Sequence, residues 1–396
     1  MTYAYFPESE GGTDFPPVPW SVFPEIEPIP AKAPRGERLK TSRAEFGGEE
    51  FSFPCPKGKA IIIIRMNGLI DTYNRRINYL RISVTDRCNL RCQYCMPKEG
   101  VSQFGHSEIL SYEEILRLAA LAVKRGINKI RITGGEPLVR KGVVHLVEKL
   151  FGLPGVNDLS MTTNAILLRE FARDLRRAGL KRLNISMDSL DPGKYREITR
   201  GGELNQVWEG IEAARREGIH PIKINVVAIA GFNDGEIEDF ARLTLKEAFQ
   251  VRFIECMPIG SLSEWKPEHC IPCAQIRERI ERLSPLVPLA EGDNGHGGPA
   301  RLFRFPGAAG QIGFISPVSD HFCGSCNRLR LTADGKLKTC LFSGELTDLK
   351  PLLRSGASDD ELEKKMDEAL LTKPLHHGPI GGVMKRCHLP MVKIGG

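Results

Sequence analysis

The chain lacks the sequence features of membrane, secreted and nucleic-acid-binding proteins. Its longest purely aliphatic run is the four isoleucines at 61–64, whereas a helix needs roughly 20 apolar residues to span a bilayer. The N-terminus has no basic start followed by an apolar stretch, so no secretory signal is indicated. Basic side chains exceed acidic ones by only six, without a long basic block. We therefore expect neither a membrane nor a nucleic-acid partner, although an anionic small substrate would suit this charge.

The eleven cysteines do not have the pattern of a disulfide framework. Their number is odd, and most of them stand in close clusters instead of dispersed pairs. Such clusters are typical of metal sites or reactive thiols in a reducing compartment, so we expect a cytoplasmic protein. The clusters are Cys88, Cys92 and Cys95, then Cys270 and Cys273, and finally Cys323, Cys326 and Cys340.

Composition divides the chain into four regions. Ten of the 27 prolines fall within the first 58 residues, where no hydrophobic period is visible. Residues 1–66 are therefore predicted to be a disordered extension, although Met66 could equally be the true start. Residues 67–257 alternate between β-rich and helical patterns, 258–371 carry the last cysteine cluster, and 372–396 are expected to be an extended tail ending in Gly-Gly.

The alternating region predicts an α/β fold. Strands are expected at 79–85, 129–133, 158–163, 181–187, 220–229 and 250–256, and helices near 111–125, 142–151, 165–178, 205–217 and 234–247. Ser111 and Glu114 have the spacing of a capping box at the start of the first helix. Successive β-α units imply parallel strands with right-handed crossovers, and six units are too few to close an eight-unit barrel. We predict an open, partial (βα)6 barrel of the TIM type, followed by a smaller irregular or antiparallel layer and a helix at 359–371.

The segment CNLRCQYC at 88–95 follows the first predicted strand directly. Its spacing lets three sulfurs converge on one metal centre, but three thiolates leave a tetrahedral zinc one ligand short. A cubane iron–sulfur cluster held by three cysteines keeps one iron open for chemistry. In β/α barrels the active site lies at this end of the strands. Three buried structural thiols are the alternative, which the polar neighbours Arg87, Asn89, Arg91 and Gln93 disfavour.

Together with GGEP at 134–137, directly after the second strand, this segment resembles the signature of the radical S-adenosylmethionine (SAM) enzymes. The resemblance implies that Cys88, Cys92 and Cys95 hold a 4Fe–4S cluster whose open iron binds SAM. Reductive cleavage of SAM then gives a radical that abstracts hydrogen. Glu136 or the adjacent backbone would receive the ammonium group of SAM. Further implied SAM contacts are Tyr94, Gly135, Ser186, Asn225 and Met257.

The segment CGSCNRLRLTADGKLKTC at 323–340 has a second set of three cysteines. By the same reasoning it predicts a second cluster with a free iron. A zinc ribbon that pairs Cys270 and Cys273 with Cys323 and Cys326 is the alternative, but the intervening gap of 49 residues is long and Cys340 would be left over. Arg328 and Arg330 share one face of the expected strand and suit phosphate oxygens. No P-loop is present.

The two cysteine trios and the terminal Gly395 and Gly396 narrow the resemblance, over roughly 68–396, to the GTP 3′,8-cyclases. That family implies hydrogen abstraction from ribose C3′ of GTP and formation of a C3′–C8 bond, the first step of molybdenum-cofactor biosynthesis. It also implies that the second cluster binds the purine, that the enzyme is a homodimer, and that cyclic pyranopterin monophosphate synthase takes the product. The implied GTP contacts are Arg81, Arg131, Thr162, Lys223, Arg328 and Arg330, and the implied catalytic residues are Arg81, Gly395 and Gly396.

Two other interpretations remain open at this point. One is a radical enzyme that modifies peptides with the help of auxiliary clusters, although such enzymes carry more C-terminal cysteines and lack the Gly-Gly end. The other is a non-catalytic zinc or electron-transfer module, which six β/α units and an open-iron motif disfavour. The amount of iron per chain would discriminate between them.

Overall fold

The computed structural model describes residues 50–53, 61–64, 68–259, 267–290, 298–378, 387 and 389–395. The chain divides into two units, Thr2–Asn67 and Gly68–Gly396. In the first unit, β1 (Glu50–Phe53) pairs antiparallel with β2 (Ile61–Ile64). The rest of the predicted N-terminal extension lies outside the described residues. Among the residues that are described, no helix is long and apolar enough to cross a membrane.

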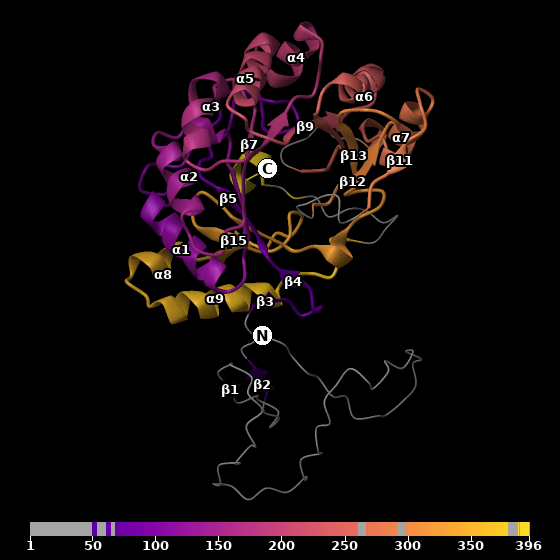
Figure 1. Ribbon diagram of the computed structural model, residues 1–396. Coiled ribbons are helices and arrows are strands. Elements are labelled where there is room, and N and C mark those ends of the chain that lie inside the picture. The colour runs from indigo at the N-terminus through magenta and orange to yellow at the C-terminus, as the bar shows by residue number, and fades with distance from the viewer. Residues whose placement is uncertain are drawn as a thin grey trace, which may run out of the picture. The chain divides into compact units, whose positions relative to one another are not determined.

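The six predicted strands form the centre of one sheet, and each runs parallel to its neighbours in chain order (Figure 1). The strands are β5 (Tyr79–Ser83), β6 (Lys129–Thr133), β7 (Asp158–Thr163), β8 (Arg182–Ser186), β9 (Ile222–Ala228) and β10 (Gln250–Glu255). Parallel pairing of consecutive strands requires a crossover after each one. The sheet stays open, so the predicted partial barrel is confirmed.

The crossover helices lie on the outer side of this sheet (Figure 1). They are α1 (Tyr112–Lys124), α2 (Val143–Phe151), α3 (Leu168–Arg177), α4 (Pro192–Thr199), α5 (Leu204–Arg216) and α6 (Ile237–Lys246). The capping box at Ser111 is confirmed, because its hydroxyl accepts from the Glu114 N–H and the Glu114 carboxylate accepts from the Ser111 N–H. No helix was predicted at α4, whose eight residues begin at Pro192 directly after the N-cap Asp191.

The C-terminal region, for which a smaller irregular or antiparallel layer is predicted, extends the barrel sheet at both edges, and its strands pair with one another antiparallel. Beyond β10 lie β13 (Gln311–Ile315), which is parallel to it, then β12 (Arg301–Arg304) and β11 (Val287–Pro288). At the other edge, β14 (Arg328–Leu331) pairs parallel with β5, followed by β15 (Lys336–Lys338) and β16 (Thr347–Asp348). The pairing of β14 with β5 joins segments about 250 residues apart, so no local pattern announces it.

The remaining elements surround these edges. A short antiparallel hairpin, β3 (Leu69–Ile70) and β4 (Arg76–Ile77), precedes the barrel. The helices are α7 (Cys273–Glu281), α8 (Lys350–Arg354), α9 (Asp359–Leu371) and α10 (Met391–Ile394). The helix predicted at 359–371 is confirmed by α9. The tail is not extended throughout, because α10 forms one turn before Gly395.

Helices α3 and α5 pack closely because Gly210 has no side chain. A Cβ atom there would overlap the carbonyl oxygen of Ala165 and lie 3.0 Å from Cβ of Leu168. Overpacking a closely packed interior costs about 1–3 kcal/mol. We expect Gly210→Ala to lower the free energy of unfolding by that amount in urea denaturation. Gly235→Ala is the control, since a Cβ at Gly235 meets no atom within 4 Å; equal stability of the two variants would contradict this packing argument.

Candidate active site

One cavity of about 310 Å³ brings together the two cysteine trios and the inner face of the barrel strands. Side chains two residues apart on a strand point to the same face, which explains why alternate residues such as Tyr79 and Arg81 line it. The predicted site residues that line the cavity are Arg81, Cys88, Cys92, Tyr94, Cys95, Arg131, Gly135, Thr162, Ser186, Lys223, Asn225, Met257, Cys323, Cys326, Arg328, Arg330 and Cys340. Gly395 is not among them, and Gly396 lies outside the described residues.

The first cysteine loop is held from outside by the end of α4. Backbone N–H groups of Arg91 and Gln93 donate to the carbonyls of Thr199 and Ile198, at 3.0 and 2.9 Å. The guanidinium group of Arg200 donates to the carbonyl of Met96 at 2.9 Å. The thiols of Cys88, Cys92 and Cys95 are free and only partly buried. Their loop is thus fixed while the sulfurs face the cavity, which fits a cluster held by three thiolates.

The glycines of GGEP make room for this loop. A Cβ at Gly134 would lie 2.7 Å from the carbonyl oxygen of Thr85, and one at Gly135 would overlap the carbonyl oxygen of Arg87. The N–H groups of Gly135 and Glu136 donate to these carbonyls at 2.7 and 2.9 Å. Glycines also permit close approach of the backbone to a ligand. The structure adds a different reason for glycine here, because the neighbouring chain segment is the group that approaches.

The carboxylate of Glu136 is already engaged within the protein. It accepts hydrogen bonds from the N–H groups of Leu138 and Asn164, at 3.1 and 2.7 Å, and from the Thr163 hydroxyl at 2.8 Å. Burial raises its pKa to about 7 in spite of these bonds. Of the two groups predicted to receive an ammonium, the adjacent backbone is therefore the better candidate.

Tyr94 is oriented by a second buried carboxylate. Its hydroxyl donates to Asp188 at 2.7 Å, and the other oxygen of Asp188 accepts from the Val227 N–H at 2.8 Å. Burial raises the pKa of Asp188 to about 6. These bonds fix the side chain of Tyr94, which belongs to the cysteine loop, at the wall of the cavity.

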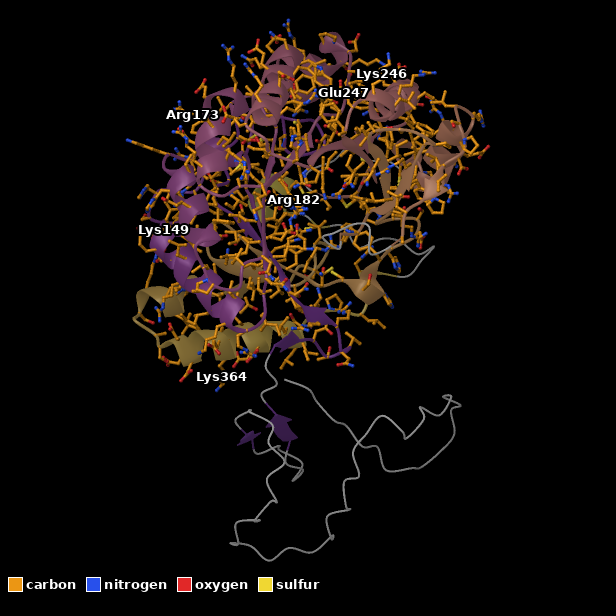
Figure 2. All side chains as sticks on the ribbon, viewed as in Figure 1. Lys149, Arg173, Arg182, Lys246, Glu247 and Lys364 are labelled. Atoms are coloured by element: carbon orange, nitrogen blue, oxygen red, sulfur yellow. The ribbon has the colours of Figure 1, made fainter. Side chains whose placement is uncertain are left out.

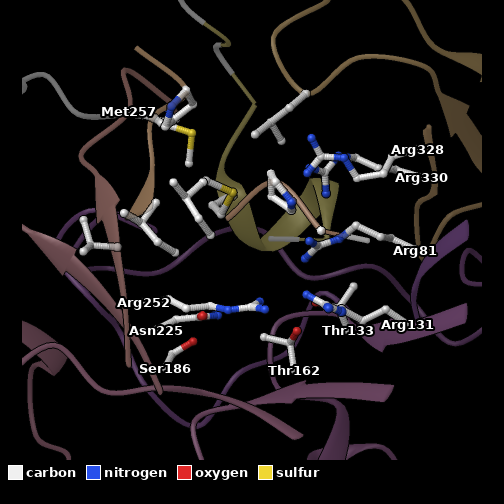
Figure 3. A pocket seen from close by; sticks show the side chains of 18 of the residues that line it. Arg81, Arg131, Thr133, Thr162, Ser186, Asn225, Arg252, Met257, Arg328 and Arg330 are labelled. Atoms are coloured by element: carbon white, nitrogen blue, oxygen red, sulfur yellow. The ribbon is translucent and has the colours of Figure 1, made fainter. Parts of the chain in front are cut away.

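Positive charge is concentrated inside the cavity. In the sheet register Arg330 pairs with Arg81, and Arg81 pairs with Arg131, so three arginines form one row across β14, β5 and β6. Figure 3 shows these side chains and Arg252 extending into the same space. Like charges on directly opposite residues destabilise a sheet. Such a row fits an anionic ligand that offsets the repulsion.

The pKa values reflect this crowding. Burial, followed by repulsion from Arg252 and Arg182, lowers the pKa of Lys223 to about 5. Burial and then Arg131 lower the pKa of Arg252 to about 9. A polyphosphate placed among these groups would favour their charged forms and raise both pKa values.

Several polar atoms in the cavity wall have no hydrogen-bond partner. Within the described ranges these include Nε of Arg81, Nε of Arg252, Oγ1 of Thr162 and Oδ1 of Asn225, all of them buried. Buried polar atoms in folded proteins are nearly always paired. Their common position on the inner face of the barrel therefore fits a bound polar ligand.

Sequence reasoning missed three basic residues and one histidine of this wall. Lys129, Arg182, Arg252 and His377 also line the cavity. In Figure 2, Arg182 lies among the strands, whereas the labelled Lys149, Arg173, Lys246, Glu247 and Lys364 lie on the outside. The signal was present for Arg252, because a charged residue in the otherwise apolar run VRFI must point to an internal site or carry a buried partner.

The second cysteine loop lies beside the row of arginines. Burial disfavours the thiolate of Cys326, but the charges of Arg328 and Lys373 outweigh it and hold its pKa at about 6. Cys270 and Cys273 do not line the cavity, and the Cys273 thiol lies 3.4 Å from the carbonyl of Ile315. Within the described ranges no three His, Cys, Asp or Glu side chains are grouped to hold a single metal ion. The zinc-ribbon alternative pairs Cys270 and Cys273 with Cys323 and Cys326, but only the second pair lines the cavity.

The C-terminal tail reaches the barrel interior. Gly395 has φ of 69°, its carbonyl accepts from Arg330 at 3.3 Å, and a Cβ on it would lie 2.9 Å from Cβ of Ser83. The left-handed backbone and the close approach both favour glycine here. Val392, three residues earlier, lines the cavity.

Comparison with known proteins identifies the family. Residues 82–244 match the model of the Radical SAM superfamily, and residues 249–379 match the model Molybdenum Cofactor Synthesis C. A GTP 3′,8-cyclase of Pelotomaculum thermopropionicum is 50% identical over 327 residues, which cover 82% of this chain and 99% of that protein. A GTP 3′,8-cyclase of Thermodesulfovibrio yellowstonii is 52% identical over 306 residues, which cover 77% of this chain and 94% of that protein. The chain belongs to the GTP 3′,8-cyclase family.

Membership of this family makes the chain a radical SAM enzyme of molybdenum-cofactor biosynthesis. Two 4Fe–4S clusters and SAM are the cofactors that follow. The crystal structure of Streptococcus suis SuiB bound to S-adenosylmethionine is similar in fold, with a TM-score of 0.52 and 15% identity over 81% of this chain and 78% of that one. Because that identity is low, the likeness concerns the fold alone. The interpretation as a non-catalytic metal module is excluded.

Proposed function

We propose that this chain converts GTP into (8S)-3′,8-cyclo-7,8-dihydroguanosine 5′-triphosphate. The observation that carries the proposal is the row of arginines that lines one cavity together with two cysteine trios. The reaction removes the hydrogen atom at ribose C3′, forms the C3′–C8 bond, and takes up one electron and one proton. When bound, the first cluster and SAM supply the radical that removes the hydrogen atom.

The residues of the chain divide the remaining work. Cys88, Cys92 and Cys95 would hold the first cluster, and Cys323, Cys326 and Cys340 the second. We propose that Tyr94, Gly135, Ser186, Asn225 and Met257 bind SAM. Arg81, Arg131, Thr162, Lys223, Arg328 and Arg330 would bind GTP, and their charges suit its triphosphate.

Arg81 and the tail would act closest to the reacting atoms. Arg81 lies at the centre of the row, and its buried Nε has no partner among the described residues. A substrate oxygen is a natural partner for that N–H. Arg330 contacts Gly395, which gives the tail a route by which it can respond to a ligand on the arginines. We propose that Gly395 and Gly396 complete the wall of the loaded site.

An anaerobic turnover assay tests the function. The chain is reconstituted with iron and sulfide and supplied with SAM, dithionite and either GTP or ATP, and products are followed by mass spectrometry. We expect 5′-deoxyadenosine together with a cyclised product from GTP but none from ATP. Cleavage of SAM without a GTP product would reject the proposed substrate and keep the radical chemistry.

We also propose a homodimer in the cytoplasm that passes its product to cyclic pyranopterin monophosphate synthase. The family resemblance supports these points. Light scattering of the anaerobic, reconstituted chain at several concentrations tests the dimer, and a mass corresponding to one chain would contradict it.

A further inference from the structure

The segment 373–377, which connects α9 to the tail, contacts the second cysteine trio. The amino group of the buried Lys373 donates to Sγ of Cys326 at 3.6 Å. Nδ1 of His377 lies 3.0 Å from Sγ of Cys323. The His377 ring also stacks on Phe342, with centroids 4.4 Å apart, two residues after Cys340. One short segment thus provides polar contacts to two of the three thiols.

The same segment is tied to the N-terminal hairpin by Arg75. Its Nη1 donates to the carbonyls of Cys323 and Leu375, at 2.8 and 3.0 Å, and its Nη2 donates to that of Pro374 at 2.7 Å. A guanidinium group has five N–H donors in a fixed plane. Three of these donors join the cysteine loop to segment 373–377. The position of the loop therefore depends on the position of that segment.

Asp71 fixes Arg75 in this position. One oxygen of Asp71 accepts from Nε of Arg75 at 2.6 Å, and the other accepts from the N–H groups of Tyr73 and Arg75 at 3.0 Å each. The side chains of Asp71 and Arg75 are 0% and 7% exposed. Breaking a buried ion pair by removing one partner leaves an uncompensated charge and is strongly destabilising. The pair is therefore a rigid link between the hairpin and the second cysteine loop.

Neither residue of this pair can contact substrate directly. Asp71 and Arg75 are absent from the residues that line the cavity, and four of the five N–H donors of Arg75 are bound to a carboxylate and three carbonyls. Their influence on the site must therefore pass through segment 373–377 and the backbone of Cys323. Groups that surround the ligands of a cluster control its orientation and its reduction potential.

We propose that Asp71 and Arg75 form a clamp that positions Lys373 and His377 against the thiols of Cys326 and Cys323, and so sets the retention and the reduction potential of the second cluster. The inference rests on the proposed assignment of Cys323, Cys326 and Cys340 as cluster ligands. The clamp residues are positioning residues, not catalytic ones.

Arg75→Lys tests the clamp, because lysine keeps the charge but lacks the planar fork. The reconstituted full chain should fall from about eight iron atoms toward about four, one cluster of four being lost. In molecules that keep the second cluster, redox titration followed by electron paramagnetic resonance should give a more negative potential, since hydrogen bonds to sulfur favour the reduced state. The first cluster is recognised by its spectral response to SAM, and its formation of 5′-deoxyadenosine should persist.

Arg76→Lys is the matched control, because Arg76 is the exposed neighbour of Arg75. If Arg75→Lys keeps the wild-type iron content and reduction potential, the proposed clamp is wrong, whereas the assignment of the cluster ligands stands. A wild-type chain that binds only about four iron atoms would overturn the ligand assignment, and the clamp with it. Lys373→Met provides a test that does not depend on folding of the hairpin, because it removes the donor to Cys326 directly. It should also make the reduction potential of the second cluster more negative. An unchanged potential would contradict the role of segment 373–377.

Discussion

Cys92→Ser and Cys326→Ser are expected to separate the two clusters. Each variant should lose about half of its iron, roughly four atoms per chain. Cys92→Ser should form no 5′-deoxyadenosine, because radical generation requires the first cluster. Cys326→Ser should still cleave SAM but form no cyclised GTP. Iron and sulfide analysis, together with mass spectrometry of both products, measures these outcomes.

The geometry gives the reason for this difference. Both loops line one cavity, but they are anchored independently. The first loop is held by the end of α4 and the GGEP backbone, as described above. The second is held by Arg75 and precedes β14. The loss of one cluster should therefore leave the other loop in place.

Cys270→Ser is the matched control for both variants. Cys270 is partly buried, like the ligand cysteines, but does not line the cavity. The Cys270→Ser variant should keep all its iron and full activity. Loss of iron in this variant would make Cys270 an iron ligand and contradict the assignment of the two cysteine trios. Formation of cyclised GTP by Cys326→Ser would contradict the proposed role of the second cluster.

Arg252→Met should weaken GTP binding and change its pH dependence. Arg252 is buried in the cavity wall with a free Nε, and methionine keeps much of its apolar volume. Loss of a hydrogen bond from a charged group costs about 1.5–3 kcal/mol. The dissociation constant for GTP should therefore rise by about 10- to 100-fold, measured by calorimetry without turnover.

The sign of the pH effect follows from Lys223. With a pKa of about 5, Lys223 is mostly neutral in the free chain at neutral pH. A bound triphosphate favours the charged form and raises that pKa, so binding takes up a proton. GTP affinity should consequently fall as pH rises between about 7 and 8.5, where the triphosphate itself is already ionised.

Burial is the largest cause of the low pKa of Lys223, and repulsion from Arg252 is the next largest. Removing Arg252 therefore relieves part of this repulsion. The Arg252→Met variant should take up fewer protons for each GTP bound than the wild type does. Calorimetry in buffers of different ionisation enthalpy measures this number. Arg282→Met is the control, because Arg282 is exposed and pairs with Glu278 on α7. Equal proton uptake in Arg252→Met and the control would refute the coupling between Arg252 and Lys223.

The sequence by itself determined the six-stranded barrel and both cysteine trios. Strand segments and their helices were visible as alternating periods, and the predicted bounds differ from the observed ones by a few residues at most. Spacing within a single loop is a local property, so three thiols within eight residues must lie near one another in any fold. The cavity residues on the barrel strands could be anticipated for the same reason, since strand ends share one mouth.

Only the tertiary structure decided how the C-terminal region completes the site. β14 pairs with β5 instead of forming a layer of its own, and this places Arg330 in register with Arg81 and Arg131. The clamp likewise joins Arg75 to carbonyls 248 and 300 residues away. Such contacts depend on which distant segments meet. Burial and hydrogen bonding in the whole fold decide which distant segments pair, so the local propensity of each segment carries no information about the pairing.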